Sequence, residues 1–263
     1  ENFYSQIGMC YDKPWMTIHN NIEGTINFTN LLFIPTEKPF DLLNSDKISK
    51  LKLYIKKVFI TDNCENVLPK YLRFVSGIID SEDISLNISR EMLQNDPVIG
   101  KIKINIVKKI LSELKKELNK SKNNYINFWE KFGAVLKEGI HEDFSNKENI
   151  LDLCLFQSSK SDNWTSISEY LERIEKKQDK IYYISGENKE NLRNSPQMEA
   201  FLKNDIEVLF FTDPVDEFWL PNIDKYKNLA FKSITKGNVD LNDFKKSKKE
   251  NNTNKKNKNF DQL

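Results

Sequence analysis

The sequence has few of the residues that build disulfide frameworks and metal sites. It contains three cysteines and two histidines among 263 residues. Cys10, Cys64 and Cys154 are far apart and odd in number, which argues against a disulfide framework and against a zinc site. His19 and His141 have no local partner at the spacing of metal ligands. Free thiols fit a reducing compartment, so we expect a cytoplasmic protein without a bound metal.

Long apolar runs are absent as well. No segment reaches 18 consecutive apolar residues, so the sequence predicts no spanning helix and no membrane partner. The chain opens with Glu1, and the residues that follow lack the basic and apolar regions of a signal peptide. Because the first residue is not methionine, we expect a piece of a longer protein.

The glycine motifs of common enzymes are missing. Eight glycines are scattered along the chain, and none belongs to a GxxxxGKS/T, GxGxxG or GxSxG pattern. No nucleophile–base pair is visible either. An independent hydrolase is therefore the least favoured function.

The charge is balanced overall but unevenly distributed. The chain has 40 Lys and Arg against 39 Asp and Glu, a net charge of +1. Residues 245–263 carry seven Lys and two acids, a net of +5, so the remainder carries −4. A mildly acidic body is not typical of a nucleic-acid-binding domain, so we expect no nucleic-acid partner. The basic tail is expected to be a flexible tether.

The hydrophobic pattern predicts two α/β units. In the first, residues 24–35 and 51–60 alternate as strands, while 71–79 could be strand or helix. Asp96 and Pro97 are a typical helix start, and a long amphipathic helix follows, with a second helix over about 124–137.

The second unit alternates helices and strands. We expect helices over 166–174 and 195–204, the latter with Ser195 as its N-cap. Strands are expected over 180–185 and 207–213, arranged as a parallel crossover.

One basic residue occupies an unusual position. Arg90, in the segment LNISREMLQ, lies at the start of a predicted helix, where the helix dipole disfavours a cation. Free backbone N–H groups at a helix start bind phosphate, so an arginine there could complete an anion site, with Gln94 one turn later as a neutral donor. Such a group could reach a nucleotide held by another domain. Alternatively, Arg90 pairs with Glu82 or Asp83 and only pins the loop.

The segment TDPVDEFWLPN, residues 212–222, follows a predicted buried strand. It holds two acids and the large apolar residues Phe218, Trp219 and Leu220. These side chains could cap the core, or they could form a contact surface for a partner.

Several segments together resemble the middle domain of the heat-shock-protein-90 chaperones. The resemblance covers residues 1–236 and is most specific over residues 71–96. The segments that carry it are LLFIPTEKPFDLL (31–43), KLKLYIKKVFITDNCENVLPKYLRFVSGIIDSEDISLNISREMLQND (50–96), FWEKFGAVLKEGIHEDF (128–144), KIYYISGEN (180–188) and IEVLFFTDPVDEFWLPN (206–222).

This resemblance implies an α/β fold of two sandwich subdomains joined by a helical segment. The corresponding division is a large subdomain over 1–140, a connecting helical segment over 141–165, a small subdomain over 166–236 and a charged linker over 237–263. The parent protein would be a homodimeric ATP-dependent chaperone with an N-terminal ATP-binding domain and a C-terminal dimerisation domain. The present chain, without those domains, is expected to be monomeric and inactive as an ATPase.

The resemblance also implies roles for individual residues. Arg90 would contact the γ-phosphate of ATP, which the N-terminal domain would hold with Mg²⁺, and Gln94 would assist. Asn87 and Ser89 would shape the loop, with Asn87 also near the γ-phosphate. The aromatic Phe59 would pack under the loop and dock against the N-terminal domain, and Glu82 would restrain the arginine.

The partners implied are client proteins and co-chaperones. Bacterial members place a client-binding aromatic residue in the DEFW segment, where Phe218 takes the aligned position, and Glu217, Phe218 and Trp219 are the client-binding residues that the resemblance implies. Two functions therefore compete: a chaperone middle domain with a phosphate-contacting arginine, and a pure interaction module whose arginine is structural.

Overall fold

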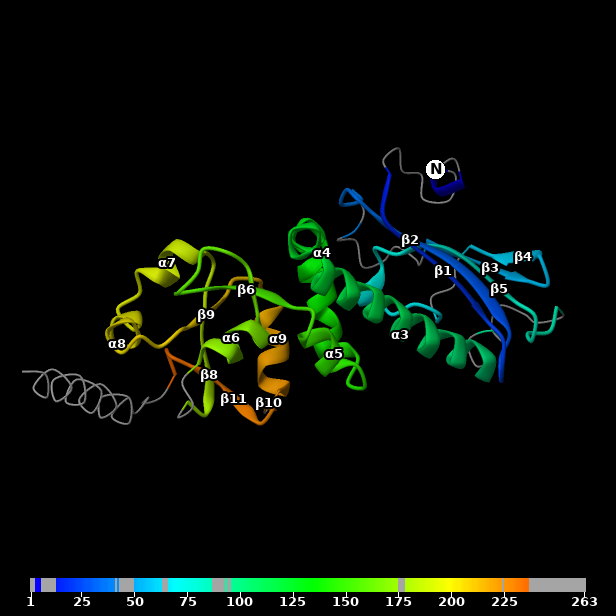
Figure 1. Ribbon diagram of the computed structural model, residues 1–263. Coiled ribbons are helices and arrows are strands. Elements are labelled where there is room, and N and C mark those ends of the chain that lie inside the picture. The colour runs from blue at the N-terminus through cyan, green and yellow to red at the C-terminus, as the bar shows by residue number, and fades with distance from the viewer. Residues whose placement is uncertain are drawn as a thin grey trace, which may run out of the picture. The chain divides into compact units, whose positions relative to one another are not determined.

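The computed structural model describes most of the chain as two compact units, Glu1–Leu153 and Cys154–Leu263. Each unit has its own sheet and helices, as the sequence predicted for an α/β fold (Figure 1). The residues that the structure describes are 3–5, 13–40, 42, 50–62, 66–86, 93, 96–174, 178–223 and 225–236.

The first unit is built on a sheet of five strands in the order β1-β2-β5-β3-β4. Only the β3–β5 pair is parallel, and the other neighbours are antiparallel. The strands are β1 Pro14–Ile22, β2 Phe28–Pro35, β3 Lys50–Ile55, β4 Val58–Thr61 and β5 Ser76–Ser81.

The single strand predicted over residues 51–60 is wrong, because the structure has a hairpin there. Lys56 and Lys57 have φ values of 49° and 70°, the left-handed region that a two-residue hairpin turn requires. The shift in alternation at these two lysines marks the turn between β3 and β4. The open segment 71–79 resolves into the short 3-10 helix η1, Lys70–Leu72, followed by β5.

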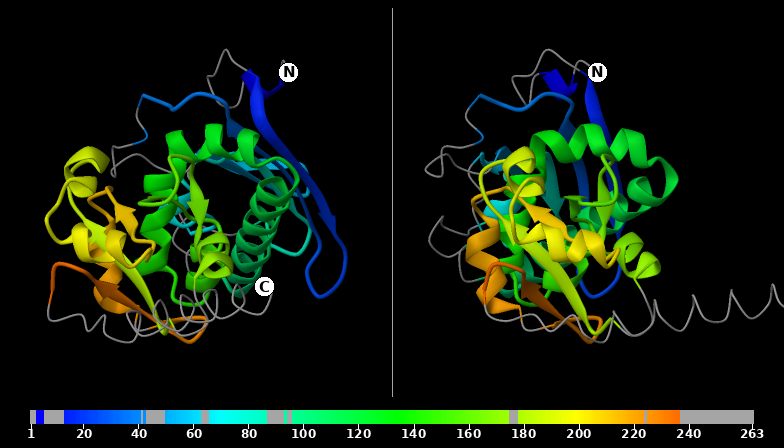
Figure 2. Two further views of the ribbon diagram at one scale, coloured as in Figure 1. Left: turned by 60° about the vertical axis from the view of Figure 1, so that its left-hand side comes forward. Right: turned by 90° about the vertical axis from the view of Figure 1, so that its left-hand side faces the viewer.

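The two predicted long helices are confirmed as α3, Pro97–Lys120, and α4, Lys122–Glu142. Asp96 caps α3 by accepting a hydrogen bond from the Val98 N–H at 2.7 Å, and Pro97 opens the helix. Figure 2 shows both helices beside the first sheet. Phe128 of α4 stacks on Trp15 of β1 at a ring-centroid distance of 4.7 Å.

Arg73 and Tyr71 join the η1 segment to α4. The Arg73 guanidinium forms a two-point ion pair with Glu138 and donates to the Leu42 carbonyl at 2.7 Å. Gly139 is required beside Tyr71, because an added Cβ would lie 2.7 Å from the tyrosine ring. The five-residue helix α5, Lys147–Leu151, completes the unit.

The second unit is built on a sheet of six strands in the order β10-β11-β8-β9-β6-β7. The parallel pairing of β8 with β9, which the sequence predicted, is confirmed. The strands are β6 Leu155–Ser158, β7 Thr165–Ser166, β8 Lys180–Ser185, β9 Leu209–Phe211, β10 Lys225–Tyr226 and β11 Leu229–Ser233. The helices are α6 Ile167–Arg173, α7 Lys189–Arg193, α8 Met198–Lys203, α9 Asp216–Trp219 and the 3-10 helix η2 Leu220–Asn222.

Two details of the second half differ from the sequence predictions. The expected connecting helical segment over 141–165 contains β6, which pairs with β9 in the second sheet, and the boundary between the units follows Leu153. Ser195 does not cap a helix, because α8 begins only at Met198, and its hydroxyl instead bonds the Gln197 side chain.

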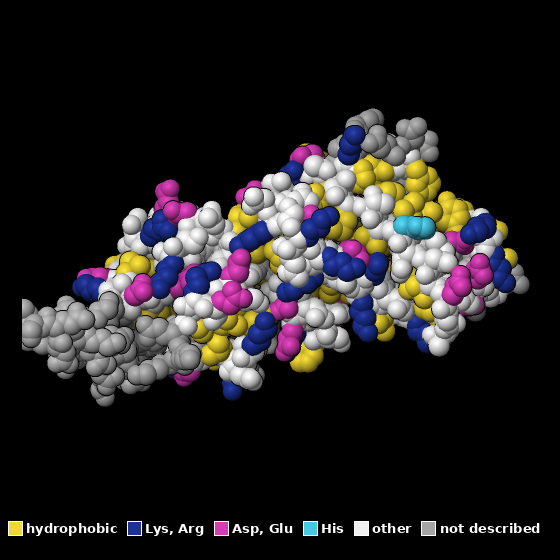
Figure 3. All heavy atoms as spheres, viewed as in Figure 1, with side chains coloured by type: hydrophobic (Ala, Val, Ile, Leu, Met, Phe, Trp, Pro, Cys, Tyr) yellow, Lys and Arg dark blue, Asp and Glu magenta, His cyan; other side chains and the backbone are white. Residues whose placement is uncertain are grey.

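The described surface mixes charges of both signs. Figure 3 shows basic and acidic side chains interspersed over the face in view. No helix among the described residues is both long and apolar enough to cross a bilayer.

Candidate functional site

Four of the predicted site residues, Asn87, Ser89, Arg90 and Gln94, lie outside the described residues. The structure does describe both flanks of their segment. On one side is the end of β5, and on the other is the capped start of α3. Along the chain, these flanks bound the segment that carries Arg90.

The end of β5 is hydrogen-bonded to the turn that precedes β2. The Glu82 N–H donates to the Asn27 carbonyl at 3.1 Å. The Asp83 carboxylate accepts hydrogen bonds from the Asn27 backbone N–H and side-chain amide. Asp83 is therefore already engaged, whereas Glu82, the other acid considered as a partner of Arg90, has an exposed side chain.

A small polar cavity lies at this end of the sheet. Its volume is about 230 Å³, and the carboxylates of Glu23, Asp80 and Glu82 are among its lining groups. Asn21, Asn27 and Thr29 supply further polar side chains. Acidic residues around a hollow favour a cation there, and Asp80 already pairs with the Lys57 ammonium at 2.8 Å.

The β3–β4 hairpin is fastened to the same end of β5. The turn residues Lys56 and Lys57 donate their backbone N–H groups to the Ser81 carbonyl and the Asp80 carboxylate, both at 3.0 Å. The Lys57 ammonium also pairs with Asp80 at 2.8 Å, and that hydrogen bond raises the pKa of Lys57. The hairpin and the Arg90 segment therefore share one anchor point.

Phe59, predicted to support the loop, projects from this hairpin. Its side chain is 51% exposed, and its ring contacts Tyr54 edge-on at 5.6 Å between centroids. Its neighbour Val58 is half-exposed as well. Two exposed apolar residues on an anchored hairpin offer a contact surface.

In the second unit, the adjacent aromatics Phe218 and Trp219 differ completely in exposure. Phe218 is 67% exposed, whereas Trp219 is 0% exposed. The Trp219 indole N–H donates to the buried Asp216 carboxylate at 2.9 Å, and the same carboxylate accepts the Asp213 N–H at 3.2 Å. Of the two alternatives for these side chains, Trp219 therefore caps the core, whereas Phe218 lies on the surface.

Trp219 belongs to the core of the second unit. Its ring contacts Phe211 of β9 at 5.4 Å and Phe231 of β11 at 5.7 Å between centroids. Phe156 of β6 lies 6.5 Å away. These contacts fix α9, so that Phe218 and the exposed Glu217 are held outward on a rigid support.

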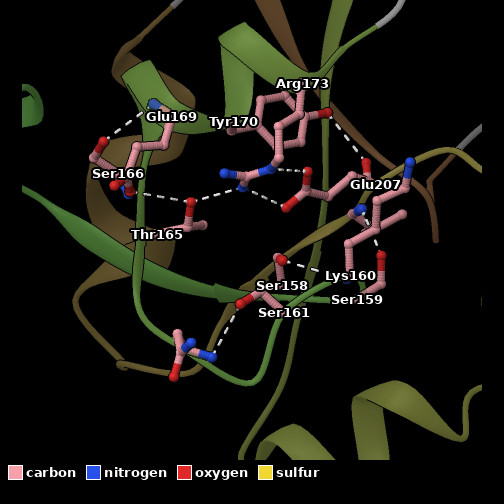
Figure 4. A network of polar contacts seen from close by, with 12 residues as sticks. Ser158, Ser159, Lys160, Ser161, Thr165, Ser166, Glu169, Tyr170, Arg173 and Glu207 are labelled. Atoms are coloured by element: carbon pink, nitrogen blue, oxygen red, sulfur yellow. Dashed lines mark hydrogen bonds and ion pairs between the residues drawn. The ribbon is translucent and has the colours of Figure 1, made fainter.

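A buried polar network fixes the strand that leads to α9. Figure 4 shows the Arg173 guanidinium directed at the Glu207 carboxylate and the Thr165 hydroxyl. Glu207 is buried and directly precedes the β9 region, while the Tyr170 hydroxyl donates to its carbonyl at 3.2 Å. Hydrogen bonding to Glu207 raises the pKa of Arg173, so the guanidinium stays charged.

The sequence analysis missed Asp80 and Asp216, the carboxylates that hold these two surfaces. The three-residue spacing from Asp216 to Trp219 was an available signal, because it places both on one helical face. No comparable local signal pointed to Asp80, whose partner Lys57 is 23 residues away. Within the described ranges, no group of three or more His, Cys, Asp or Glu side chains could hold a metal ion.

The whole chain, residues 1–263, matches the family model described as Hsp90 protein. It is 47% identical over 247 residues to the chaperone protein HtpG of Roseobacter denitrificans, an alignment that covers 94% of this chain and 40% of the relative. The HtpG of Orientia tsutsugamushi is 49% identical over 241 residues, covering 92% and 38%. The chain thus spans about two fifths of the length of these relatives.

A solved structure with the same fold is the middle domain of a heat shock protein of Plasmodium falciparum. Its TM-score is 0.78 at 34% sequence identity, and the match covers 90% of this chain and 93% of that one.

The burial of Asp216 generates a stability prediction. Asp216→Ala would leave the Trp219 indole N–H buried without an acceptor, so we expect the free energy of unfolding to fall by about 1–3 kcal/mol. Glu217→Ala, a change at the exposed neighbouring acid, should alter it by less than about 0.5 kcal/mol. Urea unfolding of the 263-residue chain measures both. Equal effects of the two substitutions would contradict the role assigned to Asp216.

Proposed function

The chain belongs to the Hsp90 protein family, and we propose that it supplies Arg90 to the γ-phosphate of ATP held by another domain of the same protein. In this proposal, Gln94 adds a neutral donor to the phosphate, and Asn87 and Ser89 shape the segment. The nucleotide and its Mg²⁺ are held by the other domain. This chain contributes electrostatic stabilisation of the charge that develops during phosphoryl transfer.

The observation that carries the proposal is the anchoring of the Arg90 segment on both sides. Residues 80–83 are bonded to the hairpin and to Asn27, while Asp96 caps α3. We infer that fixed flanks lower the cost of ordering Arg90 on a phosphate. Such preorganisation is what an arginine finger requires, because a loosely held cation pays an ordering cost.

The acid-lined cavity supports a resting position for the same arginine. Glu82 and Asp80 line it beside the start of the segment, and Asp83 is occupied by Asn27. We infer that Glu82 holds the guanidinium when no phosphate is present. In this proposal, Arg90 pairs with Glu82 in one state and contacts the phosphate in the other.

The hairpin supports docking of the nucleotide-holding domain. Phe59 and Val58 are exposed on the element that is bonded to Asp80 and Ser81. Contact at Phe59 would therefore be transmitted to the same strand end from which the Arg90 segment departs.

We also infer that α9 contacts partly folded client proteins through Phe218, with Glu217 beside it. An exposed aromatic ring on a rigid helix is a typical anchor in protein recognition. The buried Trp219 serves this surface as its support rather than as a contact.

Replacing the arginine tests the first proposal. In the full-length protein, Arg90→Ala should lower ATP turnover by about 10³-fold, the lower end of the range for arginine fingers, while ATP binding is retained. Arg193→Ala, at a partly exposed arginine of α7 that pairs with Asp162, serves as the matched control and should leave turnover unchanged. Near-normal turnover of Arg90→Ala would contradict the proposal.

A melting curve separates this function from the alternative of a pure interaction module. A phosphate-contacting Arg90 should be nearly neutral for the stability of the 263-residue chain. A structural arginine should instead lower the melting temperature on substitution, with turnover falling only through unfolding.

The client surface is tested by binding of a permanently unfolded model protein, such as reduced and alkylated α-lactalbumin. Phe218→Ser should weaken its binding about tenfold, as expected for loss of an aromatic anchor. Leu202→Ser removes another exposed apolar side chain of the same unit and should have little effect. If both substitutions weaken binding equally, the surface is not centred on α9.

A further inference from the structure

A second hollow of the first unit lies beside η1 and the end of α4. A pocket of about 520 Å³ opens between η1, the first half of α3 and the turn after α4. Leu68 and Val107 are buried residues of its lining. Its size falls within the range of pockets that hold ligands, roughly 300–1,000 Å³.

Two large apolar side chains of the lining remain exposed. Phe144 is 76% exposed and Ile104 is 55% exposed, although both line the same pocket. Single exposed apolar residues are ordinary, but two that converge on one hollow form an apolar contact surface. The Lys147 ammonium lies 3.9 Å from the centroid of the Phe144 ring and adds a positive charge at this surface.

Three lysines lie at this surface. Lys70 and Lys103 line it, and, in the described part of the chain, neither they nor Lys147 forms a salt bridge. The surface therefore offers three ammonium groups beside the exposed side chains of Ile104 and Phe144.

The two acids of the lining offset this charge incompletely. The Asp143 carboxylate accepts hydrogen bonds from the Tyr71 hydroxyl at 2.7 Å and from the backbone and side-chain nitrogens of Asn146 at 3.1 and 2.8 Å. Desolvation raises the pKa of Tyr71, which keeps it a neutral donor. Glu142 is the other acid, and desolvation together with the Glu138 carboxylate raises its pKa.

We propose that this pocket binds a protein segment that carries a bulky apolar side chain next to carboxylates. The apolar side chain enters between Ile104 and Phe144, and the carboxylates meet Lys70, Lys103 and Lys147. Charge complementarity selects an acidic segment over a basic one. The anchored Tyr71–Asp143–Asn146 bonds hold the lining in place, so that binding requires little ordering of the protein.

The test uses the 263-residue chain and a fluorescein-labelled peptide of about 12 residues, in which a Leu-Phe pair is flanked by Asp residues within a Gly-Ser background. Two matched peptides replace the Asp residues by Lys or the Leu-Phe pair by Ser. Fluorescence anisotropy should show saturable binding of the acidic apolar peptide alone, weakened by added salt.

Variants of the pocket separate the contribution of apolar contacts to peptide binding from the contribution of charge. Phe144→Ser with Ile104→Ser should raise the Kd about tenfold, because both exposed apolar contacts are lost. Lys70→Glu with Lys103→Glu should raise it by a similar factor and reduce the salt dependence. All four side chains lie outside the buried core, so a melting curve should show the fold retained.

Matched control variants show whether a change in peptide binding is specific to the pocket. Phe40→Ser changes an exposed phenylalanine of the same unit that does not line the pocket, and Lys225→Glu with Lys232→Glu changes the net charge equally in the other unit. Both controls should bind the peptide as the original chain does. The proposal is overturned by no saturable binding up to about 1 mM, by equal binding of the Lys peptide, or by equal effects of pocket and control variants.

Discussion

Residues 80–83, at the end of β5, hold together three segments that are distant in sequence. The hairpin turn bonds to Asp80 and Ser81, and the turn before β2 bonds to Glu82 and Asp83. The segment that carries Arg90 starts from this same point and ends at the Asp96 cap of α3. Because these bonds lie in the backbone and in short carboxylate side chains, the strand end is a rigid base. The exposed hairpin, the acid-lined cavity and the proposed phosphate contact all depend on it.

In the second unit, too, polar contacts hold the elements that support an exposed aromatic residue. Arg173 and Glu207 fix the approach to β9, and Asp216 holds Trp219 within an aromatic core. In each case a buried carboxylate satisfies donors that would otherwise be costly to bury. The exposed neighbour, Phe218 here and Phe59 in the first unit, is thereby left on a support that does not have to order when a partner binds. Rigid supports of this kind lower the cost of recognition.

The parts of the fold that the sequence could predict are those with local signals. The Asp96-Pro97 start and the helical apolar stripe indicated α3, and the apolar strand at 207–213 indicated β9. The predictions that failed concern positions whose structure depends on residues distant in the sequence. Lys56 and Lys57 form a turn without glycine because Asp80 and Ser81 hold it from another strand. Trp219 is buried because strands β6, β9 and β11 place aromatic rings around it. For Arg90, the helix-dipole argument left a structural role open. Only the resemblance to a family indicated a contact between this arginine and the γ-phosphate.

The most direct test of the central claim adds this chain to the separate nucleotide-holding domain that the proposal assigns to the same protein, and measures single-turnover ATP hydrolysis. The account predicts a saturable acceleration by the chain that carries Arg90 and none by the Arg90→Ala chain, although both bind the domain equally well. Equal acceleration by the two chains would show that the arginine does not act on the phosphate, and would contradict the account.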